Sequence, residues 1–397
     1  MLAVSMELND VLTHAVETGA TDVHFKLGQP PVLRSDGALA PASVFPELDE
    51  DDLATILDAV TASAPRRREA FDETGELDIA YASSGLPRFR VNGFRQRGAI
   101  SFAFRRVPSA IAGFEDLGLP AGVERLAGEP RGLVLVTGAT GSGKTTTLAA
   151  VVDYINRSRA QHIVTIEDPI EFLHADKSCI VNQREIGVDT DSFGQALRRV
   201  LRQDPDVILI GELRDAETAG VALQAAESGH LVLSTLHTID AAETLSRLIE
   251  FFPPEKQPQI VSVLAGSLRG VISQRLLPRV GGGRIPAVEV MVVNARIAEL
   301  IRERRGESIP QAIEDGEYFS MQSFTQALIR LVLDGQVERD VAANTATNQH
   351  DFLIALDRAE KLAHIRHENA QTAAAAAAAA AEAAAEEAPP TLRLAGP

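Results

Sequence analysis

The sequence predicts an α/β protein in which a small α+β domain precedes a larger domain built on a parallel sheet. Three observations lead to this prediction. The chain has 397 residues, more than the roughly 250 to 300 at which a single hydrophobic core stops growing. Apolar residues nearly alternate between residues 76 and 107, as in antiparallel hairpins. From residue 131 onward, short apolar runs alternate with helical stretches, as in a doubly wound parallel sheet.

The first elements are a helix and a strand. Four apolar residues recur at helical spacing near the start: Leu8, Val11, Leu12 and Val16. Gly19 is placed to end that helix, and PPVLRSDG predicts a strand that runs into a turn. We therefore assign residues 1–112 to the first domain. Residues 113–125 contain Pro, Gly and short apolar anchors, so we expect a linker there.

The second domain is expected to span residues 126–362. Its predicted buried strands lie in GLVLVTG, QHIVTIE, DVILIGEL and HLVLSTL. After about residue 280 the sequence is expected to be helical again. Residues 363–397 include an Ala-rich tract with too little apolar bulk to pack, so we expect a frayed or disordered tail.

Composition narrows the class of protein. The formal net charge is -17, which argues against broad electrostatic binding to nucleic acid or anionic lipid. No run approaches the roughly 18 apolar residues of a membrane span, so membrane insertion is not expected. The amino-terminal segment lacks the basic start of a signal peptide, which makes a cytoplasmic location the expectation. The one cysteine, Cys179, excludes an internal disulfide.

GATGSGKTTT, between an apolar strand and a helix, fits the phosphate-binding pattern G-x-x-x-x-G-K-[ST]. Glycines in such a loop turn backbone N–H groups toward phosphate oxygens, while Lys144 neutralises phosphate charge and the Thr145 hydroxyl can bind magnesium. The sequence therefore predicts an ATP site with Mg²⁺. Its residues are Gly138, Ala139, Thr140, Gly141, Ser142, Gly143, Lys144, Thr145 and Thr146.

Acidic residues follow two other predicted strands. Glu212 ends DVILIGEL and is the expected acidic partner of magnesium. TIEDPIEF carries Glu167 and Glu171, either of which would lie where α/β sheets place ligands. We favour Glu171 as the general base that orients the attacking water and Glu167 as a structural or magnesium-side carboxylate, but the sequence leaves this choice open.

Two histidines bracket the strand in SGHLVLSTLHT. His230 precedes this strand and His237 follows it. Both are candidates for sensing the γ-phosphate or relaying its loss, because histidine changes charge near neutral pH. Their spacing does not fit a metal site.

These four blocks, in this order and spacing, resemble the Walker A, Asp-box, Walker B and His-box elements of the secretion ATPase superfamily. Within it, the chain is most similar to the retraction ATPases of type IV pili. TDVHFKLGQPPVLRSDG and RFRVNGFRQRGAISFAFRRVPS resemble parts of that family's amino-terminal domain, and IAELIRERRGESIPQAIEDGEYFSMQSFTQAL resembles its carboxy-terminal motif. The resemblance covers about residues 5 to 360.

The resemblance implies a homohexameric ATPase whose RecA-like P-loop domain binds ATP and whose PAS-like amino-terminal domain supplies arginines. Arg90, Arg97 and Arg105 lie along the predicted hairpin and are the candidates. It also implies a partner, the inner-membrane pilus platform protein, and a location at the inner face of the cytoplasmic membrane. Nucleic acid is not an expected partner.

Other functions stay open. A type IV pilus assembly ATPase or a type II secretion ATPase would share all four blocks. Those extension-type ATPases usually carry a further amino-terminal domain and a four-cysteine metal site, neither of which is expected here, so retraction is favoured. A RecA-type nucleic-acid motor would need a basic, aromatic-rich surface, whereas this chain is acidic and only 5% aromatic. A regulatory nucleotide switch with little turnover is the third alternative.

Overall fold

The structure is a computed structural model that describes residues 7–35, 37–107 and 110–365. The chain divides into two compact units. One consists of Met1–Leu276 with Val288–Ser323, and the other of Leu277–Ala287 with Phe324–Pro397. Of the tail predicted for residues 363–397, everything after residue 365 lies outside the described residues. The domain boundaries drawn from the sequence stay predictions.

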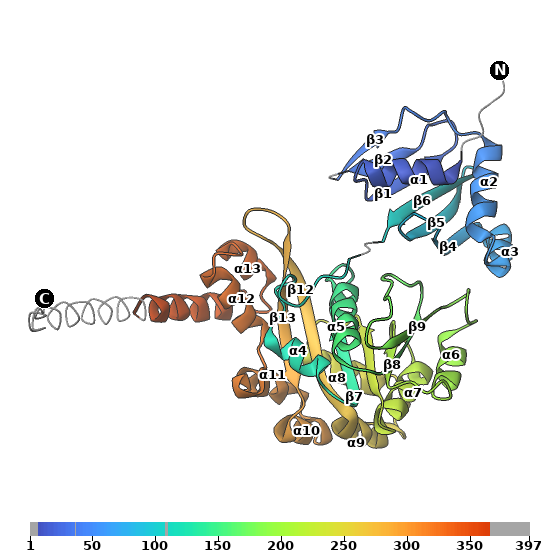
Figure 1. The fold of residues 1–397 in the computed structure, drawn as a ribbon. Coiled ribbons are helices and arrows are strands. Elements are labelled where there is room, and N and C mark those ends of the chain that lie inside the picture. Colours follow the sequence, from blue (N-terminus) through green and yellow to red (C-terminus); the bar gives the residue numbers. More distant parts are fainter. Residues whose placement is uncertain (1–6, 36, 108–109, 366–397) are drawn as a thin grey trace, which may run out of the picture. The chain divides into compact units, whose positions relative to one another are not determined.

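The amino-terminal part of the first unit is a six-stranded antiparallel sheet with helices (Figure 1). The strand order is β3 (Ala38–Pro41), β2 (Val32–Ser35), β1 (Asp22–Lys26), β6 (Ala99–Arg106), β5 (Phe89–Gln96) and β4 (Glu76–Tyr81). The helices are α1 (Leu8–Glu17), α2 (Glu50–Thr61) and α3 (Pro65–Thr74). The predicted helix and antiparallel hairpins are therefore confirmed.

Aromatic side chains fill the core of this part. Phe104 is fully buried, and its ring packs edge-on against Phe25 with 5.0 Å between ring centroids. Phe89 and Phe102 meet the same ring at 6.3 and 6.1 Å. Each such pair adds about 0.5–1.5 kcal/mol beyond its buried area, so this cluster holds the hairpin of β5 and β6 in place.

The rest of the first unit is built on a seven-stranded sheet. Its order is β13 (Arg284–Val292), β12 (Leu268–Pro278), β7 (Gly132–Thr137), β11 (Leu231–Leu236), β10 (Val207–Ile210), β8 (His162–Glu167) and β9 (Ile180–Glu185). All neighbouring pairs from β12 to β9 are parallel. The four strands predicted from the apolar runs are all present, which confirms the α/β fold class.

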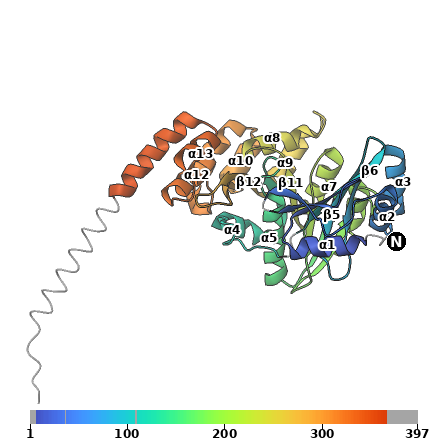
Figure 2. The same ribbon diagram turned by 90° about the horizontal axis from the view of Figure 1, so that it is seen from above.

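Helices cover both faces of this sheet, with α4 and α5 on one face and α8 and α9 on the other (Figure 2). The first of these helices are α4 (Ala121–Ala127), α5 (Lys144–Ser158), α6 (Phe193–Val200), α7 (Ala216–Glu227), α8 (Ala241–Glu250) and α9 (Gln257–Ser267). The later ones are α10 (Ala295–Arg302), η1 (Gly306–Ser308), α11 (Ile309–Glu314) and η2 (Glu317–Phe319). No helix in the described part of the chain is long and apolar enough to cross a membrane.

Two expectations from the sequence need correction. The stretch after residue 280 is not all helical, because Arg284–Val292 forms β13 at the edge of the sheet. Most residues of RIPAVEVMV are buried, so apolar and polar residues do not alternate along it. The sequence therefore lacks the period of two that identifies a strand. The expected linker 113–125 is also partly helical, since α4 begins at Ala121 and buries Val123.

The second unit has its own small core. It combines the end of the β12–β13 hairpin with α12 (Phe324–Leu333), α13 (Arg339–Thr345) and a helix at residues 349–365. Phe324, Leu328, Phe352 and Leu356 are all buried there together with Leu277.

Gly122 gives a test of how α4 packs. A Cβ atom at this position would lie 2.3 Å from the Ser320 backbone oxygen and 2.8 Å from Val290 Cγ1. Gly122→Ala should therefore lower the free energy of unfolding by about 1–3 kcal/mol, although alanine normally favours a helix. Gly266→Ala in α9, where a Cβ meets no atom within 4 Å, is the control and should be neutral or stabilising by up to about 1 kcal/mol. Urea unfolding curves measure both, and equal effects would refute this packing.

Candidate active site

The carboxyl ends of four parallel strands meet at one edge of the seven-stranded sheet. Strands β7, β11, β10 and β8 lie side by side in this order. At their carboxyl ends Thr137 pairs with Leu236, and Ile210 pairs with Ser234 on one side and with Ile166 on the other. The segments that follow these strands therefore leave the sheet at the same level. The segments that follow the four strands contain the four motif blocks found in the sequence. Parallel α/β sheets bind their ligands at the carboxyl ends of the strands, which is where these segments lie.

The glycine-rich loop after β7 has the backbone that phosphate binding requires. Gly138, Gly141 and Gly143 have φ values of 142°, 80° and 90°, which favour glycine. A Cβ on Gly138 would also lie 2.4 Å from the Gln274 backbone oxygen. Helix α5 starts at Lys144, so the N–H groups of its first turn have no partner within the helix and can bind an anion.

Lys144 is buried against this loop. Its Nζ donates hydrogen bonds to the backbone oxygens of Gly138 at 2.7 Å and Ala139 at 3.1 Å. Burial lowers the pKa of Lys144, while the charges of Glu212 and Glu171 act to raise it. Both carboxylates therefore act on the lysine electrostatically, although they follow different strands.

Glu212 is held by two basic side chains. Its carboxylate accepts a hydrogen bond from Arg214 Nε at 2.9 Å, and His237 Nε2 lies 3.3 Å from its other oxygen. The residues that follow β10 and β11 are thus brought together, and a cavity of about 530 Å³ adjoins them.

Glu167 and Glu171 have different surroundings. Glu167 is buried, and one of its oxygens accepts hydrogen bonds from Thr165 Oγ1 at 2.6 Å and Gln183 Nε2 at 3.1 Å. Burial raises the pKa of Glu167 despite these hydrogen bonds. Glu171 is about one-third exposed and pairs with Arg90 Nη1 at 2.6 Å. Of these two carboxylates, Glu171 is the one that combines solvent access with an electrostatic effect on Lys144.

The residues Glu185 and Gln183 on β9 were not predicted from the sequence. Glu185 is 3% exposed, accepts a hydrogen bond from the Ile170 N–H at 3.1 Å and pairs with Arg88. Gln183 also donates to the Phe172 backbone oxygen at 2.8 Å. Strand β9 therefore holds the segment between Glu167 and Glu171. The sequence offers only a weak signal, because β9 is too polar to read as a buried strand.

Gln274 on β12 was also missed. It is 2% exposed, and its Nε2 donates to the Ser142 backbone oxygen at 2.6 Å. Ser273, the residue before Gln274, accepts a hydrogen bond at its Oγ from Thr137 Oγ1 at 2.9 Å. Strand β12 thus supports the phosphate loop from the side opposite β11. The local sequence SQRLLP carries no pattern that would reveal this contact.

His230 does not lie at the site. It precedes β11, whereas the loop, Glu212 and His237 all follow the carboxyl ends of their strands. Its Nδ1 is 3.0 Å from the Ala225 backbone oxygen, and its own backbone oxygen accepts from the Gly132 N–H. Because the two ends of a strand lie far apart, the structure does not bring His230 to the other candidate residues, and its role stays a prediction.

The three predicted arginines have separate environments. Arg90 reaches Glu171, as described above. Arg105 Nε donates to Asp22 Oδ1 at 2.8 Å, and its side chain is 75% exposed. Arg97 lies exposed in the turn between β5 and β6 with a φ of 53°. Of these three arginines, only Arg90 contacts a predicted catalytic side chain within the described residues, and the roles of Arg97 and Arg105 stay predictions.

No cluster of three or more His, Cys, Asp or Glu side chains among the described residues could hold a metal ion by itself. A magnesium ion at this edge would need the phosphates of a nucleotide as further ligands, which is how Mg²⁺ usually binds in such sites. The predicted pair of Thr145 and Glu212 is compatible with that arrangement.

Comparison with known proteins gives consistent matches. The family model described as "Type II/IV secretion system protein" matches residues 111–282. The type IV pilus retraction ATPase PilT of Pseudomonas aeruginosa is 43% identical over 347 residues, which cover 87% of this chain and 100% of that relative. The twitching motility protein of Neisseria gonorrhoeae is 41% identical and is aligned over 81% of this chain and 86% of its own length.

A solved structure agrees with these relatives. The crystal structure of the pilus retraction motor PilT with bound ADP matches with a TM-score of 0.81 and 42% sequence identity. The match covers 87% of this chain and 98% of that one.

His174, whose N–H donates to Gln183 Oε1 at 2.8 Å, makes stability near the site depend on pH. Burial lowers its pKa from 6.5 to about 4. The unfolded chain therefore takes up this proton first as pH falls, so stability present above pH 6.5 is lost between about pH 6.5 and 4. We expect that the free energy of unfolding falls by about 2 kcal/mol from pH 7 to pH 5 because of His174. Urea unfolding of wild type and His174→Gln at both pH values measures this, and identical pH dependence would contradict it.

Proposed function

This chain belongs to the PilT-like branch of the type II/IV secretion system proteins, and on that premise we propose that it is an ATP-hydrolysing motor that retracts type IV pili. The observation that carries the proposal is a retraction ATPase aligned over its whole length at 43% identity. The glycine-rich loop, Lys144, Glu212 and Glu171 gathered at one edge of the sheet support it independently, because they supply the groups that phosphoryl transfer needs.

ATP fits the loop after β7 on physical grounds. Backbone N–H groups at the start of α5 bind phosphate oxygens, and the Lys144 ammonium neutralises charge on the β- and γ-phosphates. The Thr145 hydroxyl and Glu212 would hold Mg²⁺, which would offset the charge of the phosphates when bound. His237 and Arg214 contact the Glu212 carboxylate and orient it.

Glu171 is the better candidate for the base that orients the attacking water. A general base must come within hydrogen-bond reach of the water, and Glu171 is the more exposed of the two carboxylates. Glu167 is instead fixed by Thr165 and Gln183, which suits a structural role. The Arg90–Glu171 ion pair restrains the base in this state, so its release would accompany catalysis.

The quaternary proposal is a ring of six copies that works at the cytoplasmic face of the inner membrane. Arg97 and Arg105 would act on the nucleotide of a neighbouring copy, since their exposed guanidinium groups suit a contact formed only on assembly. The partner would be the pilus platform protein in that membrane. Nucleic acid is not proposed as a partner, since the chain carries a formal charge of -17.

Lys144→Ala tests the enzyme and the motor together. Removing the phosphate-facing ammonium should abolish ATP turnover and weaken ATP binding. In the source organism, deleting the gene should leave excess surface pili and no surface motility. The wild-type gene should restore both properties, whereas Lys144→Ala should restore neither. Normal pilus number after deletion would exclude retraction, and loss of pili would indicate assembly instead.

Glu171→Gln and Glu167→Gln form a matched pair. Glu171→Gln should slow steady-state ATP turnover by about 10²–10⁴ while ATP binding persists, because a water-orienting base is lost. Glu167→Gln keeps an oxygen that can accept from Thr165 and Gln183, so we expect less than about a tenfold loss. Turnover and fluorescent-nucleotide binding measure both. The reverse pattern would identify Glu167 as the base.

A further inference from the structure

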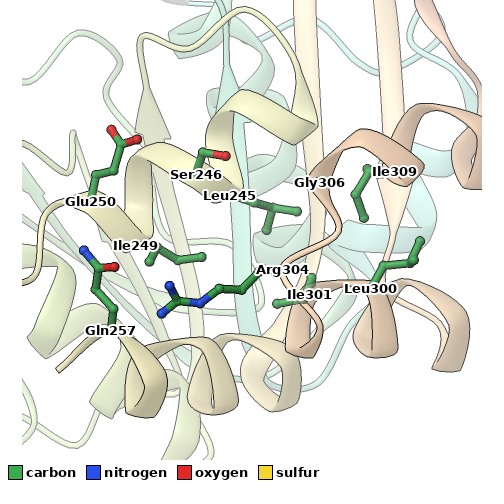
Figure 3. A pocket seen from close by; sticks show the side chains of 10 residues that line it. All are labelled: Leu245, Ser246, Ile249, Glu250, Gln257, Leu300, Ile301, Arg304, Gly306 and Ile309. Atoms are coloured by element: carbon green, nitrogen blue, oxygen red, sulfur yellow. The ribbon is translucent and has the colours of Figure 1, made fainter. Parts of the chain in front are cut away.

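A cavity of about 210 Å³ lies between α8, α9, α10 and α11, apart from the phosphate loop (Figure 3). Its floor is aliphatic: Leu245, Leu300, Ile301 and Ile309 are each 7% exposed or less. Ile249 is half-buried beside them. Part of this wall comes from the carboxy-terminal segment singled out in the sequence, which the proposed ATPase chemistry does not use.

Arg304 places a cation over this aliphatic floor. Figure 3 shows its side chain extending from the turn after α10 toward Ile249 and Gln257. Its backbone φ is 55°, a conformation that costs a non-glycine residue roughly 1–2 kcal/mol. The Arg305 N–H bond to the Leu300 oxygen, at 2.9 Å, closes this turn. A left-handed residue closed by such a hydrogen bond is a common way for a helix to end, and here it fixes where the Arg304 side chain leaves the backbone.

The guanidinium group of Arg304 is available to a ligand. Arg304 is exposed and, within the described part of the chain, forms no ion pair, whereas the adjacent Arg305 pairs with Glu303 and Glu307. Glu250, on the rim of the same cavity, lies 3.9 Å from Arg247. The cavity thus combines an aliphatic floor with one arginine that has no ion-pair partner and one carboxylate that faces a different arginine.

Size decides which class of ligand fits. A cavity of about 210 Å³ is smaller than the roughly 300–1,000 Å³ of typical small-molecule sites. It suits an aliphatic side chain inserted from a protein surface, with a carboxylate close enough to reach Arg304. We propose that this cavity, which we name the α8–α10 pocket, docks a segment of a partner protein that carries an aliphatic residue next to an acidic one.

The α8–α10 pocket is connected to the active site through one helix. Ser246 and Glu250 on α8 line both this pocket and the cavity that adjoins Glu212 and His237. A segment bound in the α8–α10 pocket would therefore contact the same helix that borders the catalytic carboxylate. The proposal itself does not depend on ATP turnover, because its evidence is the shape and charge of the pocket.

A random heptapeptide library panned on the immobilised full-length chain tests the proposal. Selected peptides should carry Asp or Glu next to Leu, Ile, Val or Met. A synthetic peptide of the enriched sequence should bind Arg304→Gln at least tenfold more weakly than wild type. Arg305→Gln is the matched control, since it removes the same charge one residue away from the pocket lining, and its affinity should stay within twofold of wild type. Thermal melts check that both variants are folded.

Several outcomes would overturn the proposal. They are the absence of any enriched sequence, enrichment without an acidic residue, and equal affinity for wild type and Arg304→Gln. Octanoate that binds as tightly as the peptide would indicate a site for a free aliphatic acid instead. A change of assembly size in light scattering on Arg304→Gln alone would indicate that a second copy of the chain fills the pocket.

Discussion

The parallel ladder of β7, β11, β10 and β8 is the constraint on which the active site depends. Backbone hydrogen bonds hold these strands in register, so the segments after them leave the sheet at one level. This arrangement brings Lys144, Glu171 and Glu212 close enough to influence one another, although they are far apart in sequence. Strands β7, β10 and β11 are buried throughout and β8 is buried except at His162, as expected for central strands of a parallel sheet.

Buried polar side chains turn this alignment into a defined geometry. Gln274 fixes the phosphate loop from β12, and Gln183 joins Glu167 to the backbone of the segment that carries Glu171. Glu185 holds the Ile170 N–H in the same segment. Gln274 and Glu185 are buried and Gln183 is half-buried, and the hydrogen bonds of these side chains restrict the loops to few conformations. Glu171, the proposed base, is thus carried by a segment that β9 holds in place, while its own partner, Arg90, lies on the other sheet.

Sequence patterns predict the parts of the molecule that follow from local rules. Continuous apolar runs reveal the four central strands, and the glycine spacing before Lys144 reveals the loop, because both patterns report directly on burial and backbone shape. The contacts of Gln274 and Glu185 join distant segments through single side chains, which no local pattern encodes. His230 shows a different limit: closeness to a motif in sequence does not say which end of a strand a residue occupies. Strand β13 could not be predicted from its sequence, because it is buried almost throughout and so lacks the alternation of apolar and polar residues that identifies strands.

Strand β12 also determines where the chain can change in length. It supports the phosphate loop at Gln274 and continues into the second unit from Leu277. Since successive residues of a strand face opposite sides, inserting one residue into β12 ahead of Gln274 would turn Gln274 away from the loop and reverse the side chains after it. The turn at residues 279–283 is exposed, contains three glycines with positive φ and carries no such alternation. Peptide tags or whole inserted domains are therefore best accommodated there, and natural length variation among homologues should be concentrated at the same turn.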